Sequence, residues 1–215
     1  MGNRLFRIYY RTCIACGSNC DIVGEESLEA VEEIVMALRR NAHVLGHGWV
    51  FRAEAGIHDG VVNEIVEAIE NGSAGSIRSM LEAGWRFEAA QALYVFLTRI
   101  EQPLIPVSIQ SLVLDNNNAN IPPEMVASDV LGLIKEQLPP THIRLLALIL
   151  HLLDCSIKLS PADELRGHTL PVSMLPVFFN IQNHHLMREW RRIITIFVEI
   201  IRQASSALNV FQHIS

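Results

Sequence analysis

The chain has 215 residues, of which 50% are hydrophobic and 19% are charged, and its formal net charge is −6. That length fits one large domain that can bury a full hydrophobic core. The acidic balance and the absence of a dense Lys/Arg block argue against nucleic acid as a partner. The longest apolar runs, 145–153 and 193–198, are shorter than the roughly 20 residues of a membrane helix. Because the first residues do not read as a signal peptide either, we expect a cytoplasmic location and no integral membrane contact.

The first 26 residues show no sustained periodicity, and we expect an N-terminal extension at 1–26, with disorder as one interpretation. This stretch holds Cys13, Cys16 and Cys20, a spacing at which thiolates bind zinc or iron–sulfur clusters. A fourth ligand does not stand close by, so free thiols are the simpler interpretation and we predict no metal site. The remaining chain divides into one domain at 27–208 and a C-terminal tail at 209–215.

Apolar residues recur at helical spacing through most of the domain. Ser27 is expected to cap the first helix, and Thr141 a long apolar helix that ends near Lys158. The pattern predicts helices at 27–40, 59–69, 87–100, 122–136, 141–158, 171–181 and 186–208, and allows a short one within 72–85. Since no alternating strand pattern or repeat is visible, we predict an all-α, single-domain bundle of seven to nine helices.

Isolated polar residues give few signs of chemistry. No glycine pattern of a nucleotide-binding loop is present. The histidines His142, His151 and His168 are interpreted as capping or surface residues. The acidic residues of the first helix are interpreted as a solvated face: Glu25, Glu26, Glu29, Glu32 and Glu33.

Four segments carry a more specific pattern. Residues 49–55 read Trp-Val-Phe-Arg-Ala-Glu-Ala, and residues 100–106 follow a predicted helix with Ile-Glu-Gln-Pro-Leu-Ile-Pro. Residues 138–142 read Leu-Pro-Pro-Thr-His before an apolar helix, and residues 170–181 read Leu-Pro-Val-Ser-Met-Leu-Pro-Val-Phe-Phe-Asn-Ile. In this order, joined by predicted helices, the segments resemble the RhoGAP domain, the GTPase-activating domain that acts on Rho-family small G proteins. The resemblance implies an all-helical fold over most of the domain.

The resemblance also implies a catalytic residue. Arg52 stands where the family has its arginine finger, and Phe51 stands beside it at a partner-binding position. A guanidinium is permanently charged and can stabilise the charge that develops during GTP hydrolysis. The flanks depart from the family, with Trp49 and Ala55 where glycines are usual. Taken by itself, the segment favours an ordinary loop arginine.

Three further positions depart from the family at the surface that faces the G protein. Tyr94 replaces a lysine, Thr98 replaces an arginine that supports the finger, and Met174 replaces an asparagine. These three residues and Phe51 are the partner-binding candidates, since Tyr and Met suit interfaces.

The sequence therefore leaves three functions open. The first is activation of Rho, Rac or Cdc42 through Arg52, which acts on the partner's GTP hydrolysis and needs no cofactor of its own. The second is a catalytically weak scaffold that binds GTPases or endocytic adaptor proteins, for which a weaker resemblance to the RhoGAP-like domain of inositol polyphosphate 5-phosphatases speaks. The third is an unrelated helical interaction domain.

Overall fold

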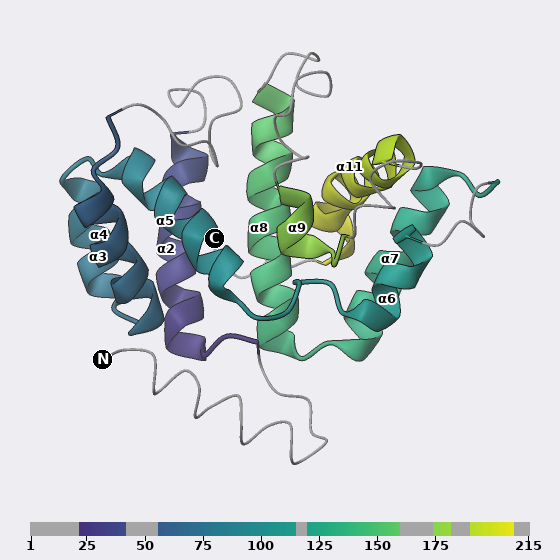
Figure 1. Cartoon of the computed structure of the whole chain (residues 1–215), viewed down its shortest axis with the longest axis horizontal. Helices are drawn as coiled ribbons and strands as arrows, with labels where there is room; N and C mark the ends of the chain where they lie inside the picture. The colour runs from purple at the N-terminus through teal and green to yellow at the C-terminus, as the bar shows by residue number, and fades with distance from the viewer. Residues whose placement is uncertain (1–21, 42–55, 115–119, 160–173, 182–189, 209–215) are drawn as a thin grey trace.

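The computed structural model describes residues 22–41, 56–114, 120–159, 174–181 and 190–208. Within these ranges the chain forms nine helices and no strand, which confirms the all-α prediction (Figure 1). The helices are α2 (Glu25–Arg40), α3 (Asp59–Glu70), α4 (Ala74–Glu82), α5 (Arg86–Arg99), α6 (Val107–Leu114), α7 (Pro123–Gln137), α8 (Pro140–Leu159), α9 (Leu175–Phe178) and α11 (Trp190–Ala207).

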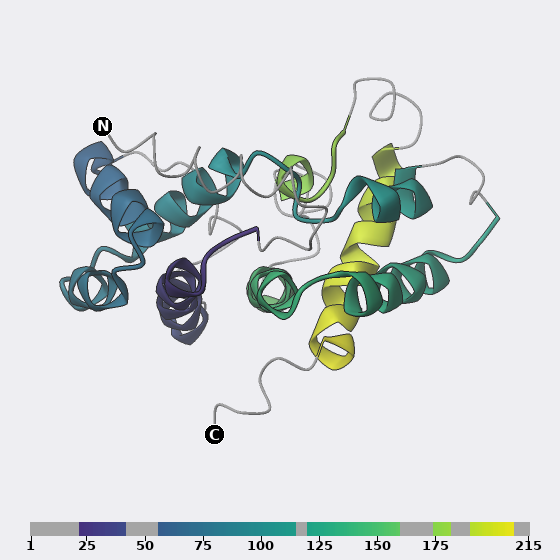
Figure 2. The same ribbon diagram turned by 90° about the horizontal axis from the view of Figure 1, so that it is seen from below.

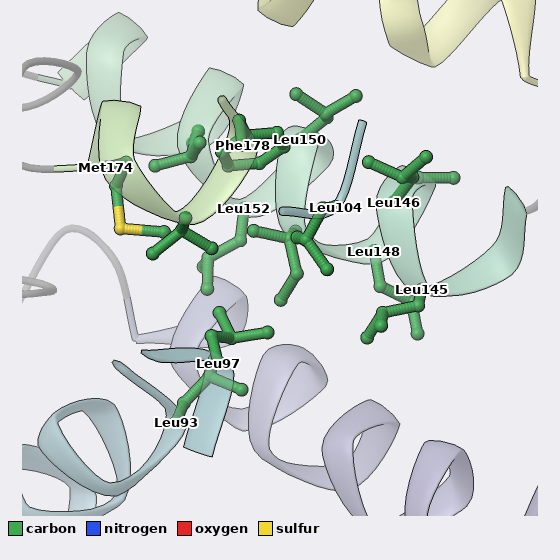
Figure 3. Packing of buried hydrophobic residues seen from close by; sticks show 14 of the residues in the cluster. Leu93, Leu97, Leu104, Leu145, Leu146, Leu148, Leu150, Leu152, Met174 and Phe178 are labelled. Carbon is green, nitrogen blue, oxygen red and sulfur yellow. The ribbon is translucent and has the colours of Figure 1, made fainter. Parts of the chain in front are cut away.

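The helices form two layers with the hydrophobic core between them. Figure 2 shows α3, α5, α9 and α6 in one layer and α4, α2, α8 and α7 in the other. Helix α11 crosses at one end, where it packs against α7 and α8. Leucines from both layers meet in the middle, among them Leu97 of α5 and Leu152 of α8 (Figure 3). Burying such side chains contributes roughly 1.5–3 kcal/mol each relative to exposure.

Most helix boundaries follow the sequence pattern, but two predicted N-caps are wrong. Helix α2 begins at Glu25, after Gly24, so Ser27 lies inside the first turn and is buried. Helix α8 begins at Pro140, which places Thr141 inside the helix. Proline suits the first turn because its missing N–H would have no partner there. Helix α6, directly after Pro106, was not predicted.

Helix α8 is the centre of the core. Among the described helices it alone has the length and apolarity of a membrane span, and 61% of that stretch is buried inside the protein. It lies between α2 and α11 and contacts both of them. Its apolar composition therefore matches its position as a central helix with protein on several sides.

The acidic face of α2 is exposed at Glu25, Glu26 and Glu29, as expected, but three ion pairs join it to neighbouring helices. Arg144 of α8 pairs with both Glu25, at 2.6 Å, and Glu32, and Arg78 of α4 pairs with Glu33. Partial burial alone would lower the pKa of Arg144, but the two carboxylates outweigh it and raise that pKa. Exposed pairs contribute only about 0–1 kcal/mol each. Their main effect is to tie α2 to its neighbours.

Three phenylalanines join α9 to α11. The ring of Phe197 on α11 lies 4.8 Å from that of Phe178 and 5.4 Å from that of Phe179, measured between centroids. All three side chains are almost completely buried. Tilted and edge-on pairs of this kind add about 0.5–1.5 kcal/mol beyond their burial. Helix α9 is therefore held by α11 as well as by the α5–α6 turn, whose hydrogen bonds are described below.

Gly72 ends α3 and brings the α3–α4 turn against α2. Its φ is +66°, and the N–H of Ser73 donates to the carbonyl of Ala68 at 2.8 Å, a pattern that closes helix C-termini. A Cβ added to Gly72 would lie 2.4 Å from the Cβ of Glu26. The glycine is thus required by both backbone conformation and space.

We predict that Gly72→Ala lowers the free energy of unfolding by at least about 1–2 kcal/mol, because alanine is strained at positive φ and overlaps α2. Gly75→Ala is the matched control, since Gly75 lies in α4 with no atom near its added Cβ. The control is expected to stabilise by about 0.4–1 kcal/mol. Urea denaturation of the two variants measures both values, and equal stabilities would contradict the packing of α2 on this turn.

Candidate functional site

The predicted site residues are only partly within the described structure. Phe51 and Arg52 lie outside the described residues. Tyr94 and Thr98 lie one turn apart on α5, in the same layer as α9, and Met174 directly precedes α9. The structure therefore places three of the five candidates on or beside two neighbouring elements.

Helix α5 carries no charge at Tyr94 and Thr98, the two positions that the resemblance aligns with cations of the family. Tyr94 is half-buried against the core. Thr98 is exposed, and its hydroxyl donates to the carbonyl of Val95 in the same helix at 2.8 Å. The neighbouring cation, Arg99, forms an ion pair with Glu70 of α3 at 2.9 Å. Arg99 is thus directed to α3, so it does not replace the family arginine at the position of Thr98.

Met174 was predicted to contact a partner, and the structure instead buries its side chain completely. Figure 3 shows it within the same cluster as Leu97, Leu152 and Phe178. Its flexible, apolar thioether suits an irregular gap in a core. A contact between Met174 and a partner would therefore require the side chain to leave the core. Its side chain packs in the core directly before the start of α9.

The turn between α5 and α6 is joined to α9 by backbone hydrogen bonds. The N–H of Leu104 donates to the carbonyl of Val177 at 2.9 Å, and the N–H of Ile105 donates to that of Phe178 at 3.2 Å. Leu104 and Ile105 are fully buried. These bonds bring the proline-rich segment at 100–106 and the segment at 170–181 together, two of the four that carried the resemblance.

Two buried side chains complete this arrangement. Gln110 of α6 donates from Nε2 to the carbonyl of Ile105 at 2.6 Å, and its Oε1 accepts from the N–H of Asn180 at 2.8 Å. His142 of α8 lies with Nε2 2.6 Å from the carbonyl oxygen of Leu104. A carbonyl oxygen only accepts, so Nε2 carries the proton. We call Leu104, Ile105, Gln110, His142 and their partners on and beside α9 the 104–105 junction.

The 104–105 junction was missed by sequence reasoning, although it connects three of the four segments. His142 was interpreted as a surface or capping residue, and this was wrong, since only 6% of the residue is exposed. Its position two residues after Leu138-Pro139-Pro140 was the available signal. Gln110 carried no signal, because a glutamine in a short helix is ordinarily a surface residue.

We predict that Gln110→Leu lowers the free energy of unfolding by about 1–3 kcal/mol, because it leaves the carbonyl of Ile105 and the N–H of Asn180 without this partner. The control is Gln102→Leu, in the exposed part of the same turn, with an expected change within about 0.5 kcal/mol. Thermal and urea unfolding monitored by circular dichroism measure the difference. Similar losses in both variants would contradict a structural role for the junction.

A second polar cluster lies where α8 approaches the C-terminal end of α2. Asp154 is buried, and its Oδ2 accepts from Lys158 Nζ at 2.6 Å. This bond raises the pKa of Lys158. Burial lowers the pKa of His151, the positive charges of Arg39 and Lys158 lower it further, and Asp154 opposes them. The fold therefore favours neutral His151.

We predict that acid destabilises the protein through His151. As the pH falls through about 6.5, the unfolded chain takes up a proton that the folded state resists, so this contribution to stability is progressively lost. The free energy of unfolding, measured from about pH 7.5 to about pH 5.5, should fall more steeply for the native sequence than for His151→Gln. Parallel pH profiles would contradict the lowered pKa.

Comparison with known proteins identifies the family. The family model described as the RhoGAP domain matches residues 28–183, which is most of the chain. A search of curated proteins and a search of solved structures each found no match. The chain belongs to the RhoGAP family. The match runs from within α2 to just past α9, so α11 lies outside it.

Membership in this family indicates a partner in general terms, because RhoGAP domains act on small GTPases. It also excludes the interpretation of the chain as an unrelated helical domain. The 104–105 junction thus belongs to a RhoGAP domain whose α5 surface is uncharged at Tyr94 and Thr98.

Proposed function

We propose that this domain accelerates GTP hydrolysis by a Rho-family GTPase (Rho, Rac or Cdc42) in the cytoplasm, with Arg52 as the arginine finger. The observation that carries the proposal is the RhoGAP match over residues 28–183. We assign the finger to Arg52 because residues 49–55 resemble the family's finger segment. Magnesium and GTP belong to the partner, so the domain needs no cofactor of its own.

The chemistry required of the domain is electrostatic. As the γ-phosphoryl group transfers to water, negative charge is spread over the phosphoryl and leaving oxygens. A guanidinium inserted from outside offers planar donors with a fixed positive charge and excludes water from the site. Arginine fingers contribute roughly a 10³- to 10⁵-fold rate increase. Arg52 is the one residue of this chain to which we assign that role.

Docking on the partner would rest on uncharged contacts. Tyr94 and Thr98 stand where the family has a lysine and an arginine, and the nearby Arg99 is paired with Glu70. Phe51 and Tyr94 are the aromatic residues proposed to contact the GTPase. Because exposed charge pairs mainly raise association rates, we expect slower association that depends little on salt.

We predict that Arg52→Ala abolishes the stimulation of GTP hydrolysis and leaves the Kd for the GTP-loaded partner within a few-fold of the native value. Single-turnover hydrolysis by Rho, Rac and Cdc42, each with an excess of domain, measures the rate. Arg202→Ala is the matched control, since Arg202 is exposed on α11 and pairs with Glu199, three residues before it in the same helix. Stimulation that survives in Arg52→Ala would exclude the finger role.

A scaffold that binds GTPases or endocytic adaptors without strong catalysis is the second candidate. The specific observation in its favour is the absence of a cation at Thr98, whose hydroxyl is already bonded within α5. Pull-downs with GTP-loaded and GDP-loaded partners separate the two functions. Nucleotide-dependent binding without stimulation would support the scaffold.

A further inference from the structure

Residues 56–58 follow shortly after Arg52 in the chain, and three features fix their position. Gly56 has a φ of +101°, a conformation that favours glycine. The N–H of His58 donates to Oε1 of Glu88 at 3.3 Å. The imidazole ring of His58 meets the indole ring of Trp85 edge-on, with 5.4 Å between centroids. We call Gly56, His58, Trp85 and Glu88 the stem anchor.

Glu88 is the unusual member of the stem anchor. Only 6% of it is exposed, although it is a carboxylic acid in the first turn of α5. Burying a polar group without a hydrogen bond is costly, and a leucine would fill the same space at lower cost. The helix N-terminus partly offsets this cost, because its dipole favours negative charge. What Glu88 offers, and an apolar residue would not, is an acceptor for the backbone of His58.

The position of the stem anchor along the chain gives it influence over Arg52. His58 lies six residues after Arg52. A residue spans at most about 3.6 Å, so six residues keep Arg52 within about 22 Å of the backbone of His58. Fixing His58 therefore limits where the Arg52 side chain can reach.

We propose that Glu88 is a positioning residue for Arg52: by holding the backbone of His58, it fixes the point from which the finger is presented. This inference rests on the proposed function of Arg52. Pre-organisation of a catalytic group lowers the barrier without changing how tightly the partners bind. The effect therefore appears in the rate of the assembled complex, whereas a general loss of structure would also weaken binding.

The test compares Glu88→Leu with Glu88→Gln in the full chain. Leucine removes the acceptor, whereas glutamine keeps a carbonyl oxygen that can accept from His58. Hydrolysis is measured at saturating domain, together with the domain concentration that gives half that rate. We expect about a 10- to 100-fold lower saturated rate for Glu88→Leu, an unchanged half-saturation concentration, and near-native behaviour for Glu88→Gln. Should Glu88→Leu fail to fold, Glu88→Ala takes its place.

The outcomes separate this inference from the function on which it rests. If the native domain stimulates hydrolysis and Glu88→Leu stimulates it equally, the positioning role is wrong while the activator function stands. The positioning role is also wrong if both variants lose rate alike, or if only the half-saturation concentration changes. If the native domain stimulates none of the three GTPases, the activator function falls and the role of Glu88 falls with it.

Discussion

The pairing of Leu104 and Ile105 with α9 is the interaction on which the arrangement of this domain depends. Helix α9 has four residues, too few to be stable by its own hydrogen bonds. It is formed where the α5–α6 turn supplies two backbone donors and where Phe197 packs against Phe178. The same turn fixes the end of α5, so α5, which carries Tyr94 and Thr98, and α9, which follows Met174, are positioned together.

Polar groups make this junction specific, while the apolar residues make it stable. Leucines could fill the space between α5, α8 and α9 in more than one way, because hydrophobic contact has little direction. Hydrogen bonds from Gln110 and His142 to the carbonyls of Ile105 and Leu104 have a direction, and both side chains are buried. Leaving these groups unbonded would be costly, so the turn is held in one register.

Local pattern predicted much of the fold, and what it missed depends on distant contacts. Helix α3 was expected at 59–69 and runs over Asp59–Glu70, because the spacing of its apolar residues is a local signal. Gln110 bonds a residue 70 positions away and His142 one 38 positions away, and no window of sequence shows such a pairing. For the candidate site, the sequence did not show that Thr98 is exposed and Met174 is buried, since neighbours in space decide the burial of both.

Helix α11 lies outside the matched RhoGAP segment but packs in the same core. The matched RhoGAP segment stops at residue 183, but Phe197 packs on Phe178 and Phe179, and α11 covers α7 and α8. Ending the chain at residue 183 would expose the apolar side chains that α11 covers and remove the contacts of Phe197 with Phe178 and Phe179. The cooperative unit of folding is thus longer than the unit of sequence similarity. Recombination, alternative splicing or proteolysis that cuts the chain at residue 183 would leave this apolar surface exposed, and the fragment would tend to aggregate.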